Sequence, residues 1–148
     1  MTDLTTITLG LLLFLPSVEA RSDTVQVQGR LICVEAGAEP PEPVDCPSEA
    51  PVRALLEETG RLYRFLPDDP KVTMFDDPRV RRRELRITGR LNPSDRLEII
   101  RVKSIVDGRL HHVYYRCEVC HITAYAYGPC WCCQDEFEFR ETLAPPPQ

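Results

Sequence analysis

Two C-x2-C pairs near the C-terminal end are the feature that most restricts how this 148-residue chain can fold. Cys117 and Cys120 form the first pair, Cys130 and Cys133 form the second, and nine residues separate them. A C-x2-C turn presents two sulfurs toward the same side of the chain, and zinc readily accepts a tetrahedron of four thiolates. Copper and iron also accept sulfur ligands. We therefore expect these four cysteines to converge on one metal ion, with zinc as the first choice and copper or iron as the others.

The residues around the two pairs predict a small ribbon. Gly128 and Pro129 stand immediately before the second pair and supply a turn at that point. After it, Phe137 and Phe139 alternate with charged residues, which indicates a short closing strand. The order of strand, knuckle, loop, knuckle and strand resembles zinc ribbons and rubredoxin-like units. Residues 113–143 are therefore predicted to form a four-cysteine metal-binding ribbon.

A second resemblance concerns the same segment. Residues 115–120 follow the pattern Y-x-C-x-x-C and residues 128–133 the pattern G-x-C-x-x-C. This resembles the short heavy-metal-binding modules of exported bacterial proteins, which follow Y-x-C-x-x-H and then P-G-x-C-x-x-C-G-M. The chain departs from that pattern at Cys120, at the extra Cys132, and at residues 134–135, which are Gln-Asp in place of Gly-Met. The resemblance implies that the segment binds a metal, and the departures leave the identity of the metal open.

Two other interpretations of the cluster stay open. Residues 117–121 also match C-x-x-C-H, the attachment sequence of c-type haem, in which His121 would be the axial ligand and the protein would transfer electrons. A haem-binding His normally opens a helix, whereas residues 122–129 are rich in β-branched and aromatic residues and end in a turn. The second alternative is a disulfide-braced interaction domain without a metal, because disulfides are common in secreted cysteine-rich segments.

Cys132 is left over once four ligands and one disulfide are assigned. It can be an unpaired thiol, an extra ligand that favours a soft ion, or a small residue packed against Trp131. His121 is the other possible extra ligand, since it directly follows the first pair.

The remaining two cysteines are predicted to form a disulfide. Cys33 ends the first expected strand, and Cys46 lies in the proline-rich segment 36–51, which we expect to be an irregular loop. In an oxidising compartment this bond would close a loop of about 14 residues and stabilise the fold by roughly 3 kcal/mol.

The sequence before the cluster predicts short β-strands. Residues 24–33 alternate between apolar and polar side chains, which is typical of a half-buried strand. The apolar phase changes within residues 97–102, which indicates a β-bulge. Residues 67–83 are expected to be an irregular excursion with one helical turn. The other expected elements are strands at 52–56, 61–66, 85–91 and 110–116, with turns at 57–60, 92–95 and 106–109.

This order of elements resembles an OB-fold over residues 24–112: a glycine-containing first strand, a hairpin, an excursion and two longer strands. An SH3-like barrel or a small sandwich would fit the same pattern. We expect a mainly β chain in which a small OB-like barrel at residues 21–112 is followed by the zinc-ribbon-like knuckle pair at 113–143. Residues 144–148 are expected to be a disordered tail.

The N-terminal residues predict export. Residues 7–16 form an apolar run as long as a signal-peptide core and too short to span a bilayer. Val18 and Ala20 are small residues at the positions that a signal peptidase reads, so residues 1–20 are predicted to be removed. The leading residues are atypical, because they carry Asp3 and no Lys or Arg. The mature protein is expected to be extracytoplasmic, periplasmic or secreted, without a transmembrane span.

Composition and motifs argue against several function classes. The formal charge of −5 offers no whole-molecule case for nucleic-acid binding. The sequence contains no nucleophile elbow, no phosphate-binding glycine loop and no carboxylate pair with a matching His. We therefore expect a non-enzymatic module whose partner is a metal ion, used for structure or for metal handling.

Charged residues outside the cluster are interpreted as surface features. The basic run at residues 79–83 is flanked by acids, which favours a solvated face. Asp68, Asp69, Asp76 and Asp77 are interpreted as acids of a loop.

Overall fold

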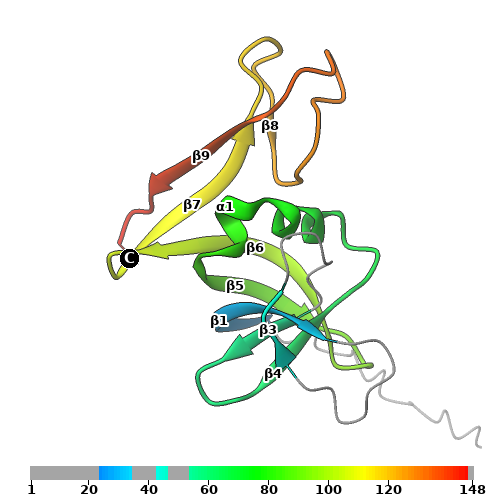
Figure 1. Cartoon of the computed structure of the whole chain (residues 1–148), viewed down its shortest axis with the longest axis vertical. Coiled ribbons are helices and arrows are strands. Elements are labelled where there is room, and N and C mark those ends of the chain that lie inside the picture. The colour runs from blue at the N-terminus through cyan, green and yellow to red at the C-terminus, as the bar shows by residue number, and fades with distance from the viewer. Residues whose placement is uncertain (1–23, 35–42, 47–53, 147–148) are drawn as a thin grey trace, which may run out of the picture.

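The computed structural model describes residues 24–34, 43–46 and 54–146, which form a mainly β protein (Figure 1). The predicted signal peptide lies outside the described residues, as does most of the proline-rich segment. Within the described residues, no helix has the length and apolar character that crossing a membrane requires. The strands are β1 (Thr24–Val34), β2 (Pro43–Val44), β3 (Ala54–Glu57), β4 (Leu62–Phe65), β5 (Glu84–Leu91), β6 (Arg96–Val106), β7 (Arg109–Arg116), β8 (Thr123–Ala124) and β9 (Glu138–Leu143).

The pairings of five strands return to their starting point. β1 pairs with both β3 and β5, β3 pairs with β4, β4 pairs in parallel with β6, and β6 pairs with β5. Every pair in this circuit except β4 with β6 is antiparallel. Gly29 of β1 lies opposite both Glu57 and Leu85, and a Cβ atom there would collide with the carbonyl group of Leu56. Glycine therefore allows β1 to pair closely with two strands at once.

The apolar faces of these strands point inward and form the core. Alternation along β5 buries Leu85 and Ile87 completely, and the same alternation along β6 buries Leu97 and Ile99. Each side chain of this size contributes about 1.5–3 kcal/mol when it leaves water. The helical segments η1 (Pro70–Asp76) and α1 (Pro78–Arg81) add further buried side chains to the same cluster, namely Met74, Phe75 and Val80.

The excursion between β4 and β5 is more helical than the sequence predicted, and two of its acids are not loop acids. Asp69 and Asp77 are both buried and cap η1 and α1, accepting hydrogen bonds from the backbone N–H groups two residues later. Each is followed by a proline at the first helical position, where a missing N–H costs nothing. Asp69 also accepts the backbone N–H of Ile99 at 2.7 Å, so it holds η1 against β6.

The phase change predicted within residues 97–102 is a β-bulge. Thr88 pairs with Arg101 and the next residue, Gly89, pairs with Ile99, so Ile100 is the extra residue on β6. The bulge leaves the Ile100 side chain 39% exposed in a strand whose neighbouring apolar residues are buried.

Three other expectations need correction. The proline-rich segment contains a short strand, since β2 pairs with Cys33 and Val34, and Pro43 is tolerated there because β2 lies at an edge. The predicted tail begins with Ala144, which is buried and donates its N–H to the carbonyl of Leu110.

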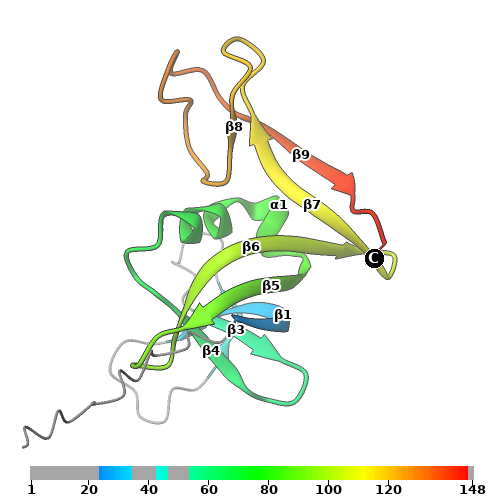
Figure 2. The same ribbon diagram turned by 180° about the vertical axis from the view of Figure 1, so that it is seen from behind.

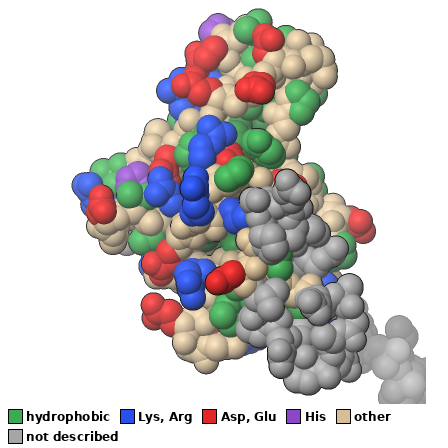
Figure 3. Space-filling model, viewed as in Figure 1, with side chains coloured by type: hydrophobic (Ala, Val, Ile, Leu, Met, Phe, Trp, Pro, Cys, Tyr) green, Lys and Arg blue, Asp and Glu red, His purple; other side chains and the backbone are tan. Residues whose placement is uncertain are grey.

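The basic run at residues 79–83 is only partly a solvated face. Lys and Arg side chains gather near α1 (Figure 3), yet the Arg81 side chain is only 8% exposed.

The chain then extends into an arm that carries the cysteines (Figures 1 and 2). β6 and β7 are joined by a tight turn in which Asp107 and Gly108 both have positive φ. β7 pairs with β6 at its start and with β8 and β9 farther on, so one continuous strand runs through the domain boundary predicted after residue 112. Glu141 of β9 ties the arm to the rest of the protein, because it accepts hydrogen bonds from Arg83 and Ser104.

Candidate metal centre

The two C-x2-C segments fold into hairpins with the same hydrogen-bond pattern. The N–H of Cys117 donates to the carbonyl of Ile122 at 3.0 Å. The N–H of Cys130 donates to the carbonyl of Asp135, also five residues later, at 2.8 Å. In each hairpin the two cysteines therefore lie in one tight turn, with β7 leading into the first and β9 following the second.

The residue after each pair has the same unusual backbone conformation. His121 has φ of 55° and Gln134 has φ of 65°, in the left-handed region that side chains with a Cβ disfavour. Each residue allows the chain to turn back at the end of its hairpin. His121 thus stands where the fold requires a left-handed residue, and its side chain is exposed.

The four sulfurs of the two pairs come together. The Sγ atoms of Cys117, Cys120, Cys130 and Cys133 all lie within 4.8 Å of one another, and those of Cys117 and Cys133 are 3.5 Å apart. Four sulfurs about 2.3 Å from a central zinc ion would be about 3.8 Å apart, whereas a disulfide requires about 2.05 Å. All four are unpaired thiols in this arrangement, which can hold one metal ion.

Backbone N–H groups shape the electrostatics of these thiols. The N–H of Cys120 donates to the Sγ of Cys117 at 3.3 Å. Burial alone would raise the pKa of the Cys130 thiol, but hydrogen bonds from the backbone N–H groups of Cys133 and Cys132 outweigh it and lower this pKa to about 7. These N–H groups therefore favour the thiolate form of Cys130, which is the form in which a cysteine binds a metal.

The fifth cysteine of the segment lies at the rim of the cluster. Cys132 is exposed and is not one of the four converging residues. Its side chain still reaches Cys120: a hydrogen bond with Cys132 is the largest cause that raises the pKa of the Cys120 thiol, followed by burial. Cys117 and Cys130 form the covered side of the cluster, whereas Cys120 faces this more open side.

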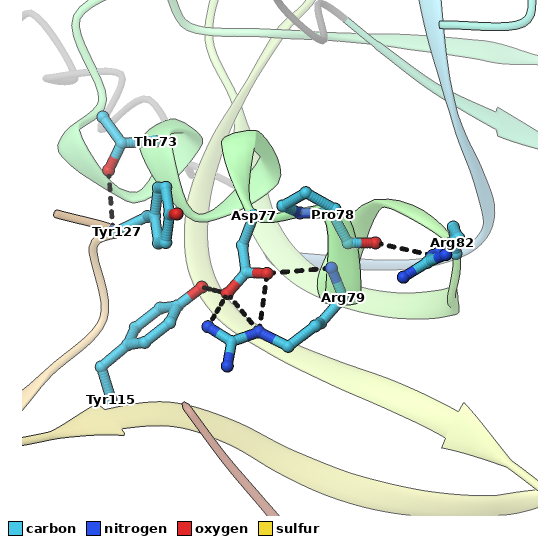
Figure 4. A network of polar contacts seen from close by, with 7 residues as sticks. All are labelled: Thr73, Asp77, Pro78, Arg79, Arg82, Tyr115 and Tyr127. Atoms are coloured by element: carbon cyan, nitrogen blue, oxygen red, sulfur yellow. Dashed lines mark hydrogen bonds and ion pairs between the residues drawn. The ribbon is translucent and has the colours of Figure 1, made fainter. Parts of the chain in front are cut away.

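A buried polar network fixes the strand that leads into the first pair (Figure 4). Tyr115 of β7 is fully buried, and its hydroxyl donates to the Asp77 carboxylate at 2.9 Å. Arg79 donates to both oxygens of the same carboxylate. Burial alone would raise the pKa of Asp77, but the hydrogen bonds from Arg79 and Tyr115 outweigh it, so this pKa lies below its ordinary value.

The loop between the two pairs also contacts the helical excursion (Figure 4). The backbone N–H of Tyr127 donates to the Thr73 hydroxyl of η1 at 3.2 Å. The rings of Tyr115 and Tyr127 are 5.9 Å apart, within the usual range for an aromatic pair. Two contacts with η1 and α1 therefore position the cysteine arm.

The local sequence gives little sign of these anchors. Asp77 was expected to be a loop acid, although the Asp77-Pro78 pair is typical of a helix N-terminus and could have indicated a cap. Nothing local in the sequence indicates that Tyr115, far along the chain, would reach this carboxylate.

The predicted disulfide is confirmed. Cys33 and Cys46 are bonded, with their Cα atoms 4.9 Å apart, and neither belongs to the four-sulfur cluster. The bond holds β2 and the residues after it against the end of β1.

Comparison of the chain with protein-family models, with curated proteins and with solved structures gives no match in any of the three searches.

Proposed function

We propose that this protein is an exported, non-enzymatic β module whose C-terminal ribbon binds one zinc ion through Cys117, Cys120, Cys130 and Cys133. The observation that carries the proposal is the convergence of these four unpaired thiols within 4.8 Å of one another. The repeated hairpin geometry supports it further, since both pairs present their sulfurs in the same way.

The proposed role of the ion is structural. Four protein sulfurs complete the coordination of zinc, which leaves no position for a water or a substrate, unlike catalytic zinc sites with three protein ligands. The two cysteine turns and the loop between them expose most of their large apolar side chains, so apolar burial contributes little to holding them in shape. Those exposed side chains are Val119, Tyr125, Tyr127 and Trp131.

The architecture that we propose for the strands before the ribbon is an OB-like barrel. The circuit β1–β3–β4–β6–β5–β1 has the strand order of that fold, including a single parallel pair. The helical excursion lies between β4 and β5, which are the third and fourth of these strands in chain order, and this also agrees with the fold.

Export is supported by the disulfide as well as by the N-terminal sequence. Disulfides such as Cys33–Cys46 persist in oxidising compartments and are rare in the reducing cytosol. Residues 1–20 have the apolar run and small-residue site of a signal peptide.

Elemental analysis of the purified mature protein, combined with a count of thiols after denaturation, tests the proposal. We expect close to one zinc per chain and five titratable thiols. Cys130→Ser should lose most of the metal, because it removes a buried ligand, whereas the matched control Cys132→Ser should keep close to one zinc per chain. The proposal fails if the metal content is far below one equivalent and no thiols are titratable, since disulfides would then explain the cluster.

The haem alternative has its own test. Covalent haem attached at Cys117 and Cys120 would give an intense absorption band at the blue edge of the visible spectrum, together with iron in the elemental analysis. We expect neither, because both of these sulfurs lie within the four-cysteine cluster and His121 is exposed outside it.

A further inference from the structure

A cleft opens where β6 and β7 separate, away from the cysteine cluster. The two strands pair only from Lys103 with His112 to Val106 with Arg109, and beyond Lys103 and His112 they diverge (Figure 2). The cleft has a volume of about 370 Å³, within the usual range of small-molecule sites. Residues of η1, β6, β7, β9 and the loop between the cysteine pairs line it, and all of them belong to the described part of the chain.

The apolar part of the lining contains side chains that the core does not use. Ile100 and Tyr125 are 39% and 57% exposed, and both line the cleft together with the buried Met74. Ile100 is there because the β-bulge adds one residue to β6 at this point, and bulges are frequent where a strand redirects a side chain toward a site. Tyr125 lies two residues before Tyr127, whose backbone N–H donates to Thr73 of η1.

The polar part of the lining is positive. Its charged groups are Lys71 and Arg101, His112 adds an imidazole, and no acidic residue lines the cleft. Lys71 lies 3.5 Å from the Asp69 carboxylate, so part of its charge is balanced. Among the described residues, Arg101 has no carboxylate within ion-pair distance.

The imidazole of His112 lies in the same positive environment. Burial lowers the pKa of its imidazole, and the charges of Lys103 and Arg101 lower it further. An anion placed beside this imidazole would stabilise its protonated form and so raise its pKa.

Backbone groups at the edges of the cleft add to its hydrogen-bonding capacity. Arg101 and Val102 pair with β5, and Val113 and Tyr114 pair with β9. In the described chain none of these four residues has a strand partner on the side that faces the cleft. Their free edges can therefore donate to or accept from a bound molecule.

We propose that this cleft binds a small aromatic anion, a flat ring that carries a carboxylate or a phosphate group. The ring packs between Tyr125 and Ile100, where its area leaves water. The anionic group lies toward Arg101 and His112, since a guanidinium can bind two oxygens of a carboxylate or phosphate at once. This function goes beyond the metal site, because none of the four converging cysteines lines the cleft.

Titration of the full mature protein with four probes, followed by NMR, tests the proposal. Benzoate and phenyl phosphate carry both features, benzyl alcohol lacks the charge, and inorganic phosphate lacks the ring. We expect saturable shifts in the signals of residues 100–102 and 112–114 with the first two probes, together with a rise of the His112 pKa. Benzyl alcohol and inorganic phosphate should each bind at least about tenfold more weakly.

Two variants locate the binding, and a third serves as control. Arg101→Gln and Tyr125→Ala change exposed side chains of the cleft and should each weaken phenyl phosphate binding by about tenfold or more. Arg109→Gln removes an exposed arginine at the hairpin turn, outside the cleft lining, and should leave binding unchanged.

The proposal is overturned if neither aromatic anion gives saturable shifts, or if inorganic phosphate binds as well as phenyl phosphate. It is also overturned if Arg109→Gln weakens binding as much as Arg101→Gln, because general charge attraction would then explain the result. Metal content is measured in the same samples, so a failure of the zinc site is seen separately from a failure of the cleft.

Discussion

The strands β1, β3, β4, β5 and β6 bury a continuous apolar core, whereas the cysteine ribbon at residues 113–143 buries only some of its large apolar side chains. Leu55, Leu85, Ile87 and Leu97 are completely buried in the first region. In the ribbon, the aromatic residues Trp131 and Tyr125 are 64% and 57% exposed. The ribbon joins the core through Val113, Tyr115 and Phe137, but apolar burial stabilises it less than it stabilises the first region.

The difference follows from size. A segment as short as the ribbon cannot bury enough apolar surface to offset the loss of chain entropy, so small modules rely on cross-links or metals. The ribbon has its convergent thiols, the pairing of β7 with β9, and the anchors at Asp77 and Thr73. If the two regions depend on different interactions, they should fail under different conditions.

Removal of the proposed metal ion should produce the largest effect and should act mainly on the ribbon. Structural zinc sites contribute roughly 10–16 kcal/mol of binding free energy near neutral pH, which is large beside the net contribution of a few hydrogen bonds and apolar contacts. A chelator, or acid that protonates the thiolates, should therefore raise hydrogen exchange across residues 113–141 while β1, β5 and β6 stay protected. Mass spectrometry of exchanged peptides measures this, and equal exchange in both regions would contradict the separation.

A cavity in the core should destabilise the strands that surround it rather than the ribbon. Leu85→Ala removes a completely buried side chain and should lower the free energy of unfolding by about 3 kcal/mol. Urea unfolding followed by fluorescence measures the change, and the zinc content of the folded variant should stay the same. Leu143→Ala is the matched control, because Leu143 is 56% exposed and should cost little. A loss of metal in the Leu85 variant would show that the core and the ribbon are one unit.

Tyr115→Phe should weaken the connection between the two regions. The variant leaves the Asp77 carboxylate without one of its donors, and a hydrogen bond to a buried charge is worth about 2 kcal/mol. Thermal unfolding should therefore begin at a lower temperature. An unchanged midpoint would indicate that β7 is held by its strand pairings alone.

The Asp77 carboxylate should make the stability of the fold depend on pH. Because the folded-state pKa of Asp77 lies below its ordinary value of 3.8, its stabilisation is present above that value and is lost as the pH falls through the folded pKa. Acid unfolding curves of the wild type should be steeper in this range than those of Tyr115→Phe. Curves of equal slope would argue against this contribution.

Replacing the residue after either cysteine pair with glycine should have the smallest effect of these changes, a modest increase in stability. His121 and Gln134 have left-handed backbone conformations that cost about 1–2 kcal/mol for residues with a Cβ. His121→Gly and Gln134→Gly relieve this strain but increase the entropy of the unfolded chain, so the net gain should be below about 1 kcal/mol. Metal content should not change in either variant. A loss of metal in His121→Gly alone would instead make His121 a ligand.

Local patterns in the sequence were enough to predict most of the strands and turns. The alternation along residues 85–91, the bulge within 97–102 and the turn at 106–109 all appear in the structure. These features depend on the backbone preferences and burial of neighbouring residues, which a short window of sequence contains. The pairing of Cys33 with Cys46 was predictable as well, because a strand end and the following loop are close along the chain.

The sequence by itself determined which residues carry sulfur and how each C-x2-C turn presents it. Only the tertiary structure decided that the two turns meet, that Cys132 stays at their rim, and that Tyr115 reaches Asp77. It also decided where β6 and β7 separate and leave a positive, apolar cleft. Contacts of this kind join residues far apart in the chain, and they depend on how the sheet closes and bends rather than on the preferences of any one segment.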